Sequence, residues 1–365
     1  MSIFLLDGEP TRPPGAGASE IDRTFTALRQ PLRSMTHTHR RPVVPSTSRT
    51  LFAACLAMLT LGATPAHAAF PGGNGRIAFN SDRDGDLDIY SVTPGGSALR
   101  NLTADSPGED ALPNWSPDGR QIAFMSDRVT PTNPTADFEL FVMKADGSQP
   151  RQITSNLLDD EDPAWSPSGR ALVFSRDFNP VRGEIDNDLM VVADTGLDER
   201  KLTNTPGVND LDPNWSPDGS RIAFTNASDG DDEIYTIDPQ GANVRKLTRN
   251  KVDDGNSDDD PDVDAYPNWS PDGRMITFTS NRDDKYEIYR MRRDGRRQTR
   301  LTVTTGDYGN ARPAWSPNGR LIAFSSSRAG SPDIYRMRAD GKGKATGLVV
   351  RNDAEEYDAD WQPRR

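Results

Sequence analysis

The sequence predicts an all-β fold, a six-bladed β-propeller of four-stranded antiparallel blades that is closed by the C-terminal strand pairing into the first blade. Three observations predict it. Tryptophan recurs at intervals of 46 to 54 residues, one turn phrase follows it, and the two ends of the repeat array complement each other. The six tryptophans are Trp115, Trp165, Trp215, Trp269, Trp315 and Trp361.

The first strand of each repeat ends in tryptophan and is expected to lie at a sheet edge. Proline stands two positions before the first five tryptophans, and proline has no N–H to donate to a neighbouring strand. These prolines are Pro113, Pro163, Pro213, Pro267 and Pro313. Ser-Pro-Asp-Gly or a near copy follows, in which proline presets φ and glycine takes the left-handed position of a hairpin turn.

Three further strands complete each repeat. The second strands are short and apolar, at residues 77–79, 122–124, 172–174, 222–224, 276–278 and 322–324. The third strands contain pairs such as Ile89-Tyr90, and a turn with glycine follows each of them. The fourth strands end in Leu-Thr or Ile-Thr, except in the last repeat, which has Leu348-Val349. Four short strands with one edge marked by proline predict a propeller blade whose marked edge lines the central channel.

The ends of the repeat array predict how the ring closes. The first unit begins at its second strand, residues 76–79, and has no tryptophan strand before it. The last tryptophan strand, residues 357–361, has no further unit after it. We therefore expect this C-terminal strand to pair with residues 76–79 and to complete the first blade, which closes a ring of six blades.

The segment before the repeats has the parts of a secretory signal peptide. Arginines precede an apolar run at residues 51–63, and small residues at Ala66 and Ala68 form a cleavage site. The run is shorter than the roughly 20 apolar residues that span a bilayer. We expect residues 1–34 to be a disordered leader or a mis-assigned start, 35–68 a Sec-type signal peptide, and 69–365 the propeller.

Removal of residues 1–68 would leave a chain with no histidine and no cysteine, because Cys55 and all three histidines lie before Ala69. It would carry 36 basic and 51 acidic residues, a formal charge of −15. This composition excludes Ser-His-Asp and Cys-His catalysis and zinc sites of His or Cys. The negative charge argues against binding to a nucleic-acid backbone, which needs a basic stripe.

The repeat resembles the PD40 (WD40-like Asp-Pro repeat) family, the propeller of the TolB family. The phrase P-x-W-S-P-D-G-R-x-I-A-F carries the resemblance, together with the Leu-Thr endings and an S-x-R phrase. The latter occurs at Ser81/Arg83, Ser126/Arg128 and Ser280/Arg282. The resemblance implies a six-bladed propeller over about residues 70–365. TolB proteins also have an α/β domain before the propeller, which we expect to be absent here.

Acidic residues recur five positions before each tryptophan, and they are the first candidate binding site. The residues at this position are Asp110, Asp160, Asp210, Asp264, Asn310 and Glu356. Three positions before tryptophan, Asp162, Asp212 and Asp358 add negative charge, and Arg312 adds a positive charge. If the ring closes, these groups converge on one mouth of the channel. They then suit Ca²⁺ or a cationic ligand. Alternatively, each carboxylate caps its own turn or pairs with an S-x-R arginine.

Two acidic loops are further candidates for Ca²⁺, because hard cations take oxygen ligands. The loop at residues 253–264 includes Asp258, Asp259, Asp260 and Asp262, and the loop at 82–88 alternates aspartate with other residues. Neither follows the EF-hand pattern. A solvated loop is the alternative for residues 253–263. Ca²⁺ is the one cofactor that the sequence suggests.

The sequence therefore favours an exported, non-enzymatic binding scaffold of the cell envelope or the extracellular space. Its expected partner is an envelope or extracellular protein or a cationic peptide, and we expect a monomer that is neither embedded in a membrane nor bound to nucleic acid. The alternative is a carboxylate-based hydrolase or lyase acting on glycans, since aspartate and glutamate abound. A role like that of TolB in the envelope is a third hypothesis.

Overall fold

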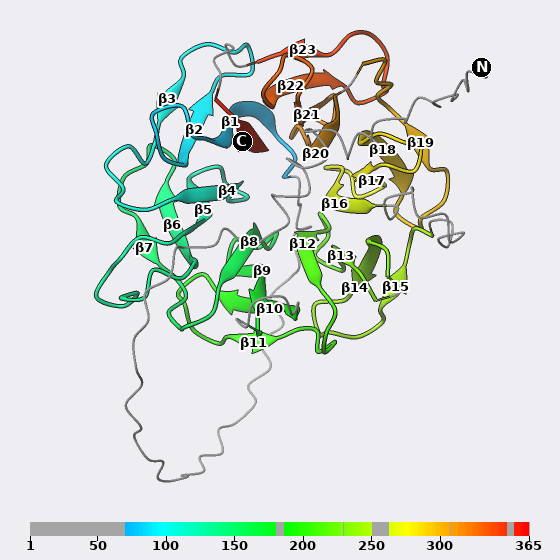
Figure 1. Ribbon diagram of the computed structural model, residues 1–365. Helices are drawn as coiled ribbons and strands as arrows, with labels where there is room; N and C mark the ends of the chain where they lie inside the picture. Colours follow the sequence, from blue (N-terminus) through cyan, green and yellow to red (C-terminus); the bar gives the residue numbers. More distant parts are fainter. Residues whose placement is uncertain are drawn as a thin grey trace, which may run out of the picture. The chain divides into compact units, whose positions relative to one another are not determined.

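The computed structural model describes residues 70–179, 186–228, 230–249, 263–306, 308–348 and 354–364. The expected leader and signal peptide lie outside this range, as does most of the acidic loop at 253–264. The described residues form six four-stranded antiparallel sheets around a ring (Figure 1), which confirms the predicted six-bladed propeller. Over the same residues, no helix has the length and apolar character needed to cross a membrane.

Each sheet is one blade, and we number the blades I to VI in chain order. Blade I contains β24 (Glu356–Arg364), β1 (Gly73–Ser81), β2 (Asp88–Val92) and β3 (Arg100–Asn101). Blade II contains β4 (Asp110–Trp115), β5 (Gln121–Ser126), β6 (Glu139–Lys144) and β7 (Arg151–Gln152). Blade III contains β8 (Asp160–Trp165), β9 (Ala171–Asp177), β10 (Asn187–Ala193) and β11 (Arg200–Lys201).

The other three blades repeat this order. Blade IV contains β12 (Asp210–Trp215), β13 (Ile222–Asn226), β14 (Glu233–Ile237) and β15 (Arg245–Lys246). Blade V contains β16 (Asp264–Trp269), β17 (Met275–Ser280), β18 (Glu287–Arg292) and β19 (Thr299–Arg300). Blade VI contains β20 (Asn310–Trp315), β21 (Leu321–Ser326), β22 (Asp333–Arg338) and β23 (Thr346–Gly347).

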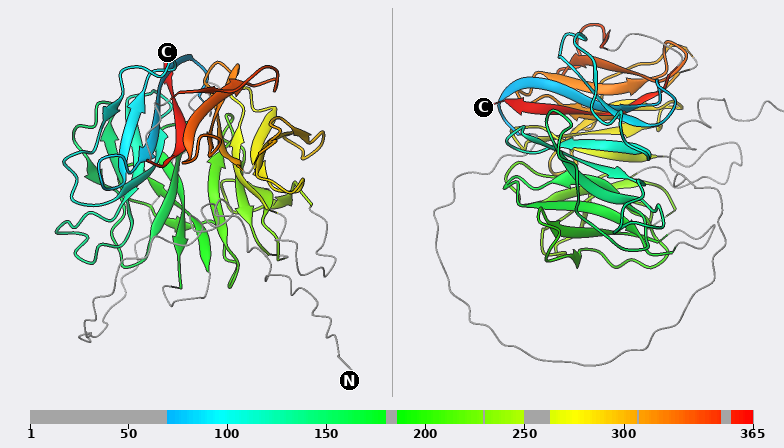
Figure 2. Two further views of the ribbon diagram at one scale, coloured as in Figure 1. Left: turned by 45° about the horizontal axis from the view of Figure 1, so that its top comes forward. Right: turned by 90° about the vertical axis from the view of Figure 1, so that its left-hand side faces the viewer.

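The C-terminal strand closes the ring as predicted. β24 pairs with β1 in antiparallel register, with Ile77 opposite Trp361 and Ser81 opposite Glu356. The two strands lie side by side in Figure 2, although they come from opposite ends of the described chain. Blade I is therefore built from both ends, and its pairing holds the first and last blades together.

The tryptophans fill the spaces between blades. Trp115 of blade II packs with Ala78 and Ile89 of blade I, and Trp165 of blade III packs with Ala123 of blade II. All six tryptophans are at most 7% exposed. Because each indole contacts the preceding blade, the hydrophobic core of the ring is a series of interfaces between blades.

Each first strand contains a β-bulge just before the proline. The pairing register shifts between the residues four and one positions before tryptophan. The residue three positions before tryptophan has a left-handed backbone with φ of 53° to 57°, at Leu112, Asp162, Asp212, Tyr266, Arg312 and Asp358. A bulge redirects its side chain, and none of the six is glycine, the residue that takes this conformation without strain.

Candidate functional site

The predicted ring five positions before tryptophan is buried inside the blades and does not line the channel cavity. Its members are Asp110, Asp160, Asp210, Asp264, Asn310 and Glu356, each at most 1% exposed. They begin the first strands, where the pairing with the second strand places each opposite the S-x-R segment, such as Asp110 opposite Ser126. The six groups therefore do not converge on the mouth of the channel, contrary to our expectation. Each of them is held instead by a nearer polar partner.

An arginine of the same blade neutralises most of these acids. Arg128 donates to both carboxylate oxygens of Asp110 at 2.7 and 2.8 Å, and Arg176 does the same for Asp160 at 2.5 and 2.8 Å. The remaining arginine contacts are Arg282 with Asp264, Arg83 with Glu356, and Arg328 with the Oδ1 of Asn310. Asn226 donates to Asp210 at 2.5 Å. Paired and buried, these groups stabilise the blades.

The S-x-R phrase holds each arginine in place for this pairing. The Nε of Arg128 donates to the Ser126 hydroxyl at 2.9 Å, and its guanidinium lies 4.8 Å from the ring centre of Phe141. Arg282 repeats this arrangement with Ser280 at 2.8 Å and Tyr289 at 5.1 Å. Serine and aromatic ring thus orient the guanidinium toward the carboxylate.

A second series of buried acids begins the third strand of every blade, and our sequence analysis missed it. Its members are Asp88, Glu139, Asp188, Glu233, Glu287 and Asp333, each at most 2% exposed. The signal was present in the sequence, because an acidic residue precedes every Ile-Tyr-like pair.

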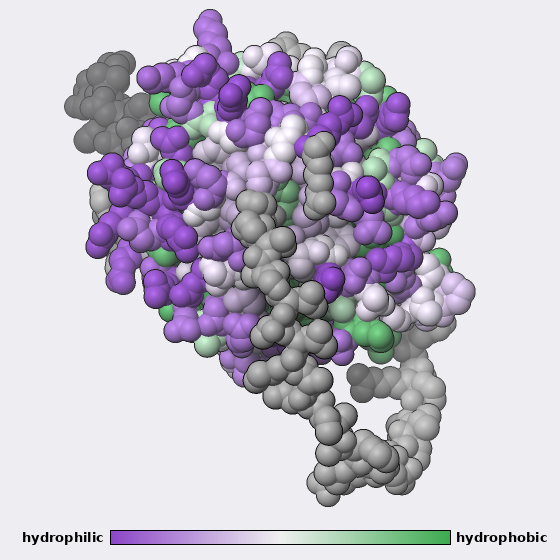
Figure 3. All heavy atoms as spheres, turned by 180° about the vertical axis from the view of Figure 1, so that it is seen from behind, coloured by the Kyte–Doolittle hydropathy of each residue, from purple (hydrophilic) through white to green (hydrophobic). Residues whose placement is uncertain are grey.

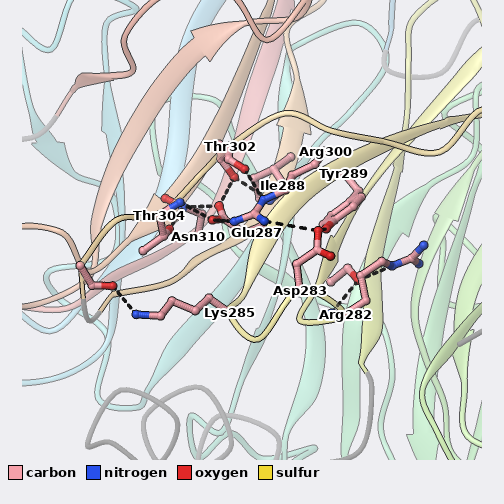
Figure 4. A network of polar contacts seen from close by, with 12 residues as sticks. Arg282, Asp283, Lys285, Glu287, Ile288, Tyr289, Arg300, Thr302, Thr304 and Asn310 are labelled. Carbon is pink, nitrogen blue, oxygen red and sulfur yellow. Dashed lines mark hydrogen bonds and ion pairs between the residues drawn. The ribbon is translucent and has the colours of Figure 1, made fainter. Parts of the chain in front are cut away.

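Glu287 shows how a member of this series is satisfied (Figure 4). Arg300 donates to Glu287 Oε1 at 2.6 Å, and the Nδ2 of Asn310, from the next blade, donates to Oε2 at 2.8 Å. Thr302 and the backbone N–H of Thr304 donate to the same carboxylate. Burial alone would raise the pKa of Glu287, but the hydrogen bonds from Thr302 and Arg300 hold it below its ordinary value.

A cation accompanies this acid in three consecutive blades. Lys201 lies 2.5 Å from Asp188, Lys246 lies 3.1 Å from Glu233, and Arg300 pairs with Glu287. The equivalent fourth-strand residues in blades VI, I and II are Gly347, Asn101 and Gln152, which carry no charge.

Two carboxyl pKa values in these blades differ from that of Glu287. Burial raises the pKa of Glu139 to about 8, and the charge of Asp160 adds to the shift. Burial raises the pKa of Glu356 to about 8 as well, with Asp333 adding and Arg83 opposing. Blades I and II therefore each hold a buried carboxyl group whose pKa lies well above its ordinary value.

The central cavity has a volume of about 120 Å³ and is lined by the bulge residues of all six first strands. Three of the predicted site residues, Asp162, Asp212 and Asp358, contribute to this wall. Leu112, Tyr266 and Arg312 occupy the other bulge positions. Asp360 also lines the cavity, so its wall holds four aspartates and one arginine, all half-buried.

Arg312 neutralises one side of the cavity. It forms an ion pair with Asp358, donates to the Tyr266 hydroxyl at 3.2 Å, and lies 4.4 Å from the centre of the Tyr266 ring. Burial opposes the charge of Arg312, but Asp358 and Tyr266 raise its pKa above the ordinary value. Arg312 therefore keeps its charge, and Asp358 is its ion-pair partner.

Asp162 and Asp212 occupy neighbouring positions of the wall, on blades III and IV. Ser175 donates to Asp162 Oδ2 at 3.0 Å, and Thr225 donates to Asp212 Oδ2 at 2.8 Å. Burial raises the pKa of Asp162 to about 7, and the neighbouring charge of Asp212 adds to the shift. Two adjacent carboxylates that raise each other's pKa form a site where a cation would be favourable.

A layer of amides lines both the central cavity and the tryptophan end of the channel, and it ties the blades together. Asn114, Asn214 and Asn268, each directly before a tryptophan, accept from the backbone N–H of the next tryptophan at 2.9 to 3.1 Å. Asp360 takes the same role at the closure, accepting from the N–H of Trp115 at 2.7 Å. Phe70 and several tryptophans line a smaller cavity of about 30 Å³ at this end of the channel.

Of the two acidic loops, the structure describes the one at residues 82–88. Carboxylate oxygens of Asp84, Asp86 and Asp88 lie within 4.8 Å of one another. The amide of Asn101 donates to Asp84 at 2.6 Å and to Asp88 at 2.7 Å, so the side chain of Asn101 already bridges two of them. The predicted Ca²⁺ ligands Asp258, Asp259, Asp260 and Asp262 lie outside the described residues.

Comparison with known proteins gives sequence matches over parts of the repeat. Residues 258–365 match the model of the TolB beta propeller domain (PD40). A TolB homolog of Chlorobium luteolum is 46% identical over 55 residues, and the Tol-Pal system protein TolB of Bordetella pertussis is 38% identical over 64 residues. These alignments cover 15% and 17% of this chain, and 12% of the length of either relative.

Solved structures share the fold over most of the ring. TolB from Acinetobacter baumannii has a TM-score of 0.64 at 21% identity, covering 81% of this chain and 69% of that one. A puromycin-hydrolyzing peptidase of Mycobacterium tuberculosis has a TM-score of 0.50 at 15% identity, covering 72% and 42%. Similarity at such identities shows the fold and leaves activity open. The chain is a six-bladed β-propeller that is similar to the propeller of TolB, and its residues 258–365 match the TolB beta propeller domain.

Proposed function

We propose that this protein is an exported, non-enzymatic scaffold that binds a cationic segment of an envelope or extracellular protein at the mouth of its central cavity. The observation that carries the proposal is the charge of the cavity wall. The side chains of four aspartates, Asp162, Asp212, Asp358 and Asp360, line the cavity, and Arg312 is the one basic residue among the lining residues of the described structure. A lysine or arginine side chain of a partner would offset this excess of acidic groups.

The backbone of the cavity wall supports a role in binding. Six non-glycine residues adopt the left-handed conformation at the same position, each at a cost of roughly 1 to 2 kcal/mol. Strain of this kind persists where the surrounding structure enforces it, and it clusters at ligand sites. Here it directs six different side chains into one small space, which gives the otherwise repetitive ring an asymmetric surface.

The partner class follows from the relatives and from the predicted export. Since one relative is named a Tol-Pal system protein, an envelope protein of such a system is a candidate partner. Ca²⁺ is a second candidate occupant, because two adjacent carboxylates provide oxygen ligands. Bound Ca²⁺ would compete with a cationic peptide for Asp162 and Asp212.

The glycan-acting alternative finds less support. Its paired carboxylates would be Asp162 and Asp212, one of them with a raised pKa. However, the cavity of about 120 Å³ is smaller than the pockets of roughly 300 to 1,000 Å³ that hold small-molecule ligands. A tip of one side chain fits this volume better than a chain of sugar rings does.

Calorimetry with a short lysine-rich peptide tests the proposal. We expect the double variant Asp162→Asn/Asp212→Asn to bind the peptide roughly tenfold more weakly or worse, because two charge-assisted contacts are lost. The matched control is Asp118→Asn/Asp146→Asn, which removes the same charge from exposed turns. Equal affinity of the two variants would contradict a site at the cavity mouth.

A panel of glycans tests the alternative separately. The wild-type protein is expected to release no reducing sugar from any of them. Turnover that disappears in Asp162→Asn/Asp212→Asn and persists in the control would establish the enzyme instead.

A further inference from the structure

Positive charge is concentrated in one segment of this acidic protein. Residues 274–346, which cover most of blades V and VI, contain 16 basic and 7 acidic residues, a formal charge of +9. Residues 69–365 as a whole carry −15. The ring is thus electrically polarised from one side to the other.

The exposed bases of this segment gather on the turns at the tryptophan ends of the strands. Backbone hydrogen bonds hold the two kinds of turn together, from Arg293 N to Arg274 O at 3.0 Å and from Ala339 N to Arg320 O at 2.9 Å. We call the following residues the basic face: Arg274, Arg292, Arg293, Arg296, Arg297, Arg320, Arg338, Lys342 and Lys344, all exposed. Figure 3 views the molecule from behind, the side on which β24 ends, and hydrophilic residues surround its rim.

Few acids offset the charge of the basic face. Arg338 pairs with Asp340 at 2.7 Å, whereas Arg274 and Arg293 have only long contacts of 4.0 and 3.8 Å, with Asp272 and Asp218. In the corresponding turns of blade IV, Arg221 and Arg245 are balanced by Asp218 and Asp238. The excess of positive charge is therefore specific to blades V and VI.

Other arginines of these blades are structural, and the basic face is distinct from them. Arg290 donates to the carbonyl of Ala339 at 2.7 Å, and Arg336 donates to the carbonyl of Pro94, so both fasten the turn of the next blade. Arg297, in contrast, occupies a turn position with φ of 56° that glycine or asparagine would favour. Arginine stands at this strained position with its side chain exposed.

We propose that the basic face binds an anionic phospholipid surface. The arginines can each take two phosphate oxygens, a geometry that lysine lacks. The basic residues are spread over the turn tips of two adjacent blades, whereas the described cavities lie in the channel. The basic face therefore suits a ligand that is itself an extended charged surface. Leu99 and Arg100, exposed on the corresponding turn of blade I, add an apolar tip and a further charge beside blade VI.

Binding of a lipid surface to the basic face is compatible with binding of a partner at the cavity mouth. The basic face lies at the tryptophan ends of the strands, where Phe70 lies in the channel, whereas the acidic wall precedes the tryptophans. A lipid surface bound to the basic face leaves the acidic cavity free for a partner. The proposal does not depend on the proposed function, because the two use different residues.

Vesicle flotation of the whole chain tests the proposal. The vesicles contain either phosphatidylcholine alone or equal parts of phosphatidylcholine and phosphatidylglycerol, at low and at physiological ionic strength. The patch variant changes Arg292, Arg296, Arg297 and Lys342 to glutamine. The control variant removes four exposed bases from blades II to IV, changing Arg120, Lys144, Arg170 and Arg249 to glutamine. All three proteins share residues 1–69, so any contribution of that segment is equal.

We expect the wild-type protein and the control variant to bind the phosphatidylglycerol vesicles and to dissociate as salt rises. The patch variant should bind them roughly tenfold more weakly or worse, with an unchanged melting temperature and unchanged peptide binding at the cavity. Equal binding to both vesicle types, no binding at all, or equal losses in the two variants would overturn the proposal. Displacement from the vesicles by polyglutamate at the same concentration of charge would overturn it in favour of an acidic protein partner.

Discussion

Glu139 and Glu287 occupy equivalent positions in blades II and V and differ in two neighbours, because Asp160 lies near Glu139 where Asn310 donates to Glu287. Arg300 donates to Glu287, whereas the residue equivalent to Arg300 in blade II is Gln152. The pKa of Glu287 is below its ordinary value, and that of Glu139 is raised to about 8. The base on the adjacent strand and the charge of the neighbouring first-strand residue therefore shift the pKa values of these two buried carboxyl groups in opposite directions.

Substitution of these two glutamates by glutamine should have opposite consequences for stability. Glu287→Gln removes the buried carboxylate that pairs with the half-buried Arg300 and should lower the free energy of unfolding at pH 7 by about 1 to 3 kcal/mol. Glu139→Gln should cost much less, because the glutamate is already partly neutral. Urea denaturation of both variants measures the difference. Equal losses in the free energy of unfolding would contradict the conclusion that Glu287 is charged and Glu139 is largely neutral.

The pH dependence of stability provides a second readout for the same pair. The folded protein holds Glu139 with a raised pKa, so its contribution is greatest at low pH and falls as pH rises toward about 8. Glu139→Gln should therefore flatten the decline of stability between about pH 5 and pH 9. Glu287→Gln should leave that decline in place and instead reduce the loss of stability at acid pH.

Binding at the cavity should also depend on pH through Asp162, whose pKa is about 7. A cationic ligand favours the ionised carboxylate, so its affinity should rise as pH increases from about 6 to about 8. Calorimetry at several pH values measures this slope. Asp162→Asn should abolish most of it, and an unchanged slope in that variant would assign the titration to another group.

At the scale of the element, the first strands of blades II to VI combine three features that work together, whereas β24 has Ala359 in place of the proline. In each of these five strands the proline marks the inner edge, the bulge directs one side chain into the cavity, and the tryptophan packs against the preceding blade. The turn after tryptophan requires glycine because φ there is 64° to 67° in all five copies. These turns share one backbone conformation but have different neighbours, which makes them suitable for a matched comparison.

Gly119 and Gly169 provide that comparison. Both have nearly the same φ, but a Cβ at Gly119 would lie 2.2 Å from the carbonyl oxygen of Pro363 in the closing strand β24. A Cβ at Gly169 would lie 3.4 Å from the Pro117 side chain. Both alanine variants incur the cost of the left-handed backbone, about 1 to 2 kcal/mol.

Gly119→Ala should therefore destabilise the protein more than Gly169→Ala does. The difference between the two losses of stability measures the cost of displacing the closing strand, because the cost of the left-handed backbone is common to both variants. Thermal denaturation measures both melting temperatures. Equal decreases would show that the contact between Gly119 and Pro363 contributes little to closure.

At the scale of the whole molecule, the repeat made the fold predictable. Tryptophan, proline and turn phrases recur in every unit, so each local pattern supports the same architecture. The position of the candidate site was less predictable. The arginines that neutralise the ring at Asp110 and its equivalents lie about 16 to 18 residues further along the chain, and pairing between strands brings them together.

Two features of the site lay beyond the pattern analysis for physical reasons. The bulge that directs Asp162 and Asp212 into the cavity depends on a left-handed φ at residues that rarely adopt it, so composition gives no sign of it. The interaction between Glu287 and Asn310 links neighbouring blades, and its partners are apparent only once the ring is closed. The acid at the start of every third strand, in contrast, was visible in the repeat.

Ring closure by the C-terminal strand can be tested directly by truncation. A chain ending at Ala354 lacks β24, including Trp361, which is 3% exposed and pairs opposite Ile77. Loss of a buried tryptophan alone costs about 3 to 5 kcal/mol. Urea denaturation of the truncated and the complete chain should therefore show a decrease of at least this size in the free energy of unfolding. An identical unfolding curve for both chains would contradict the closed ring on which this account rests.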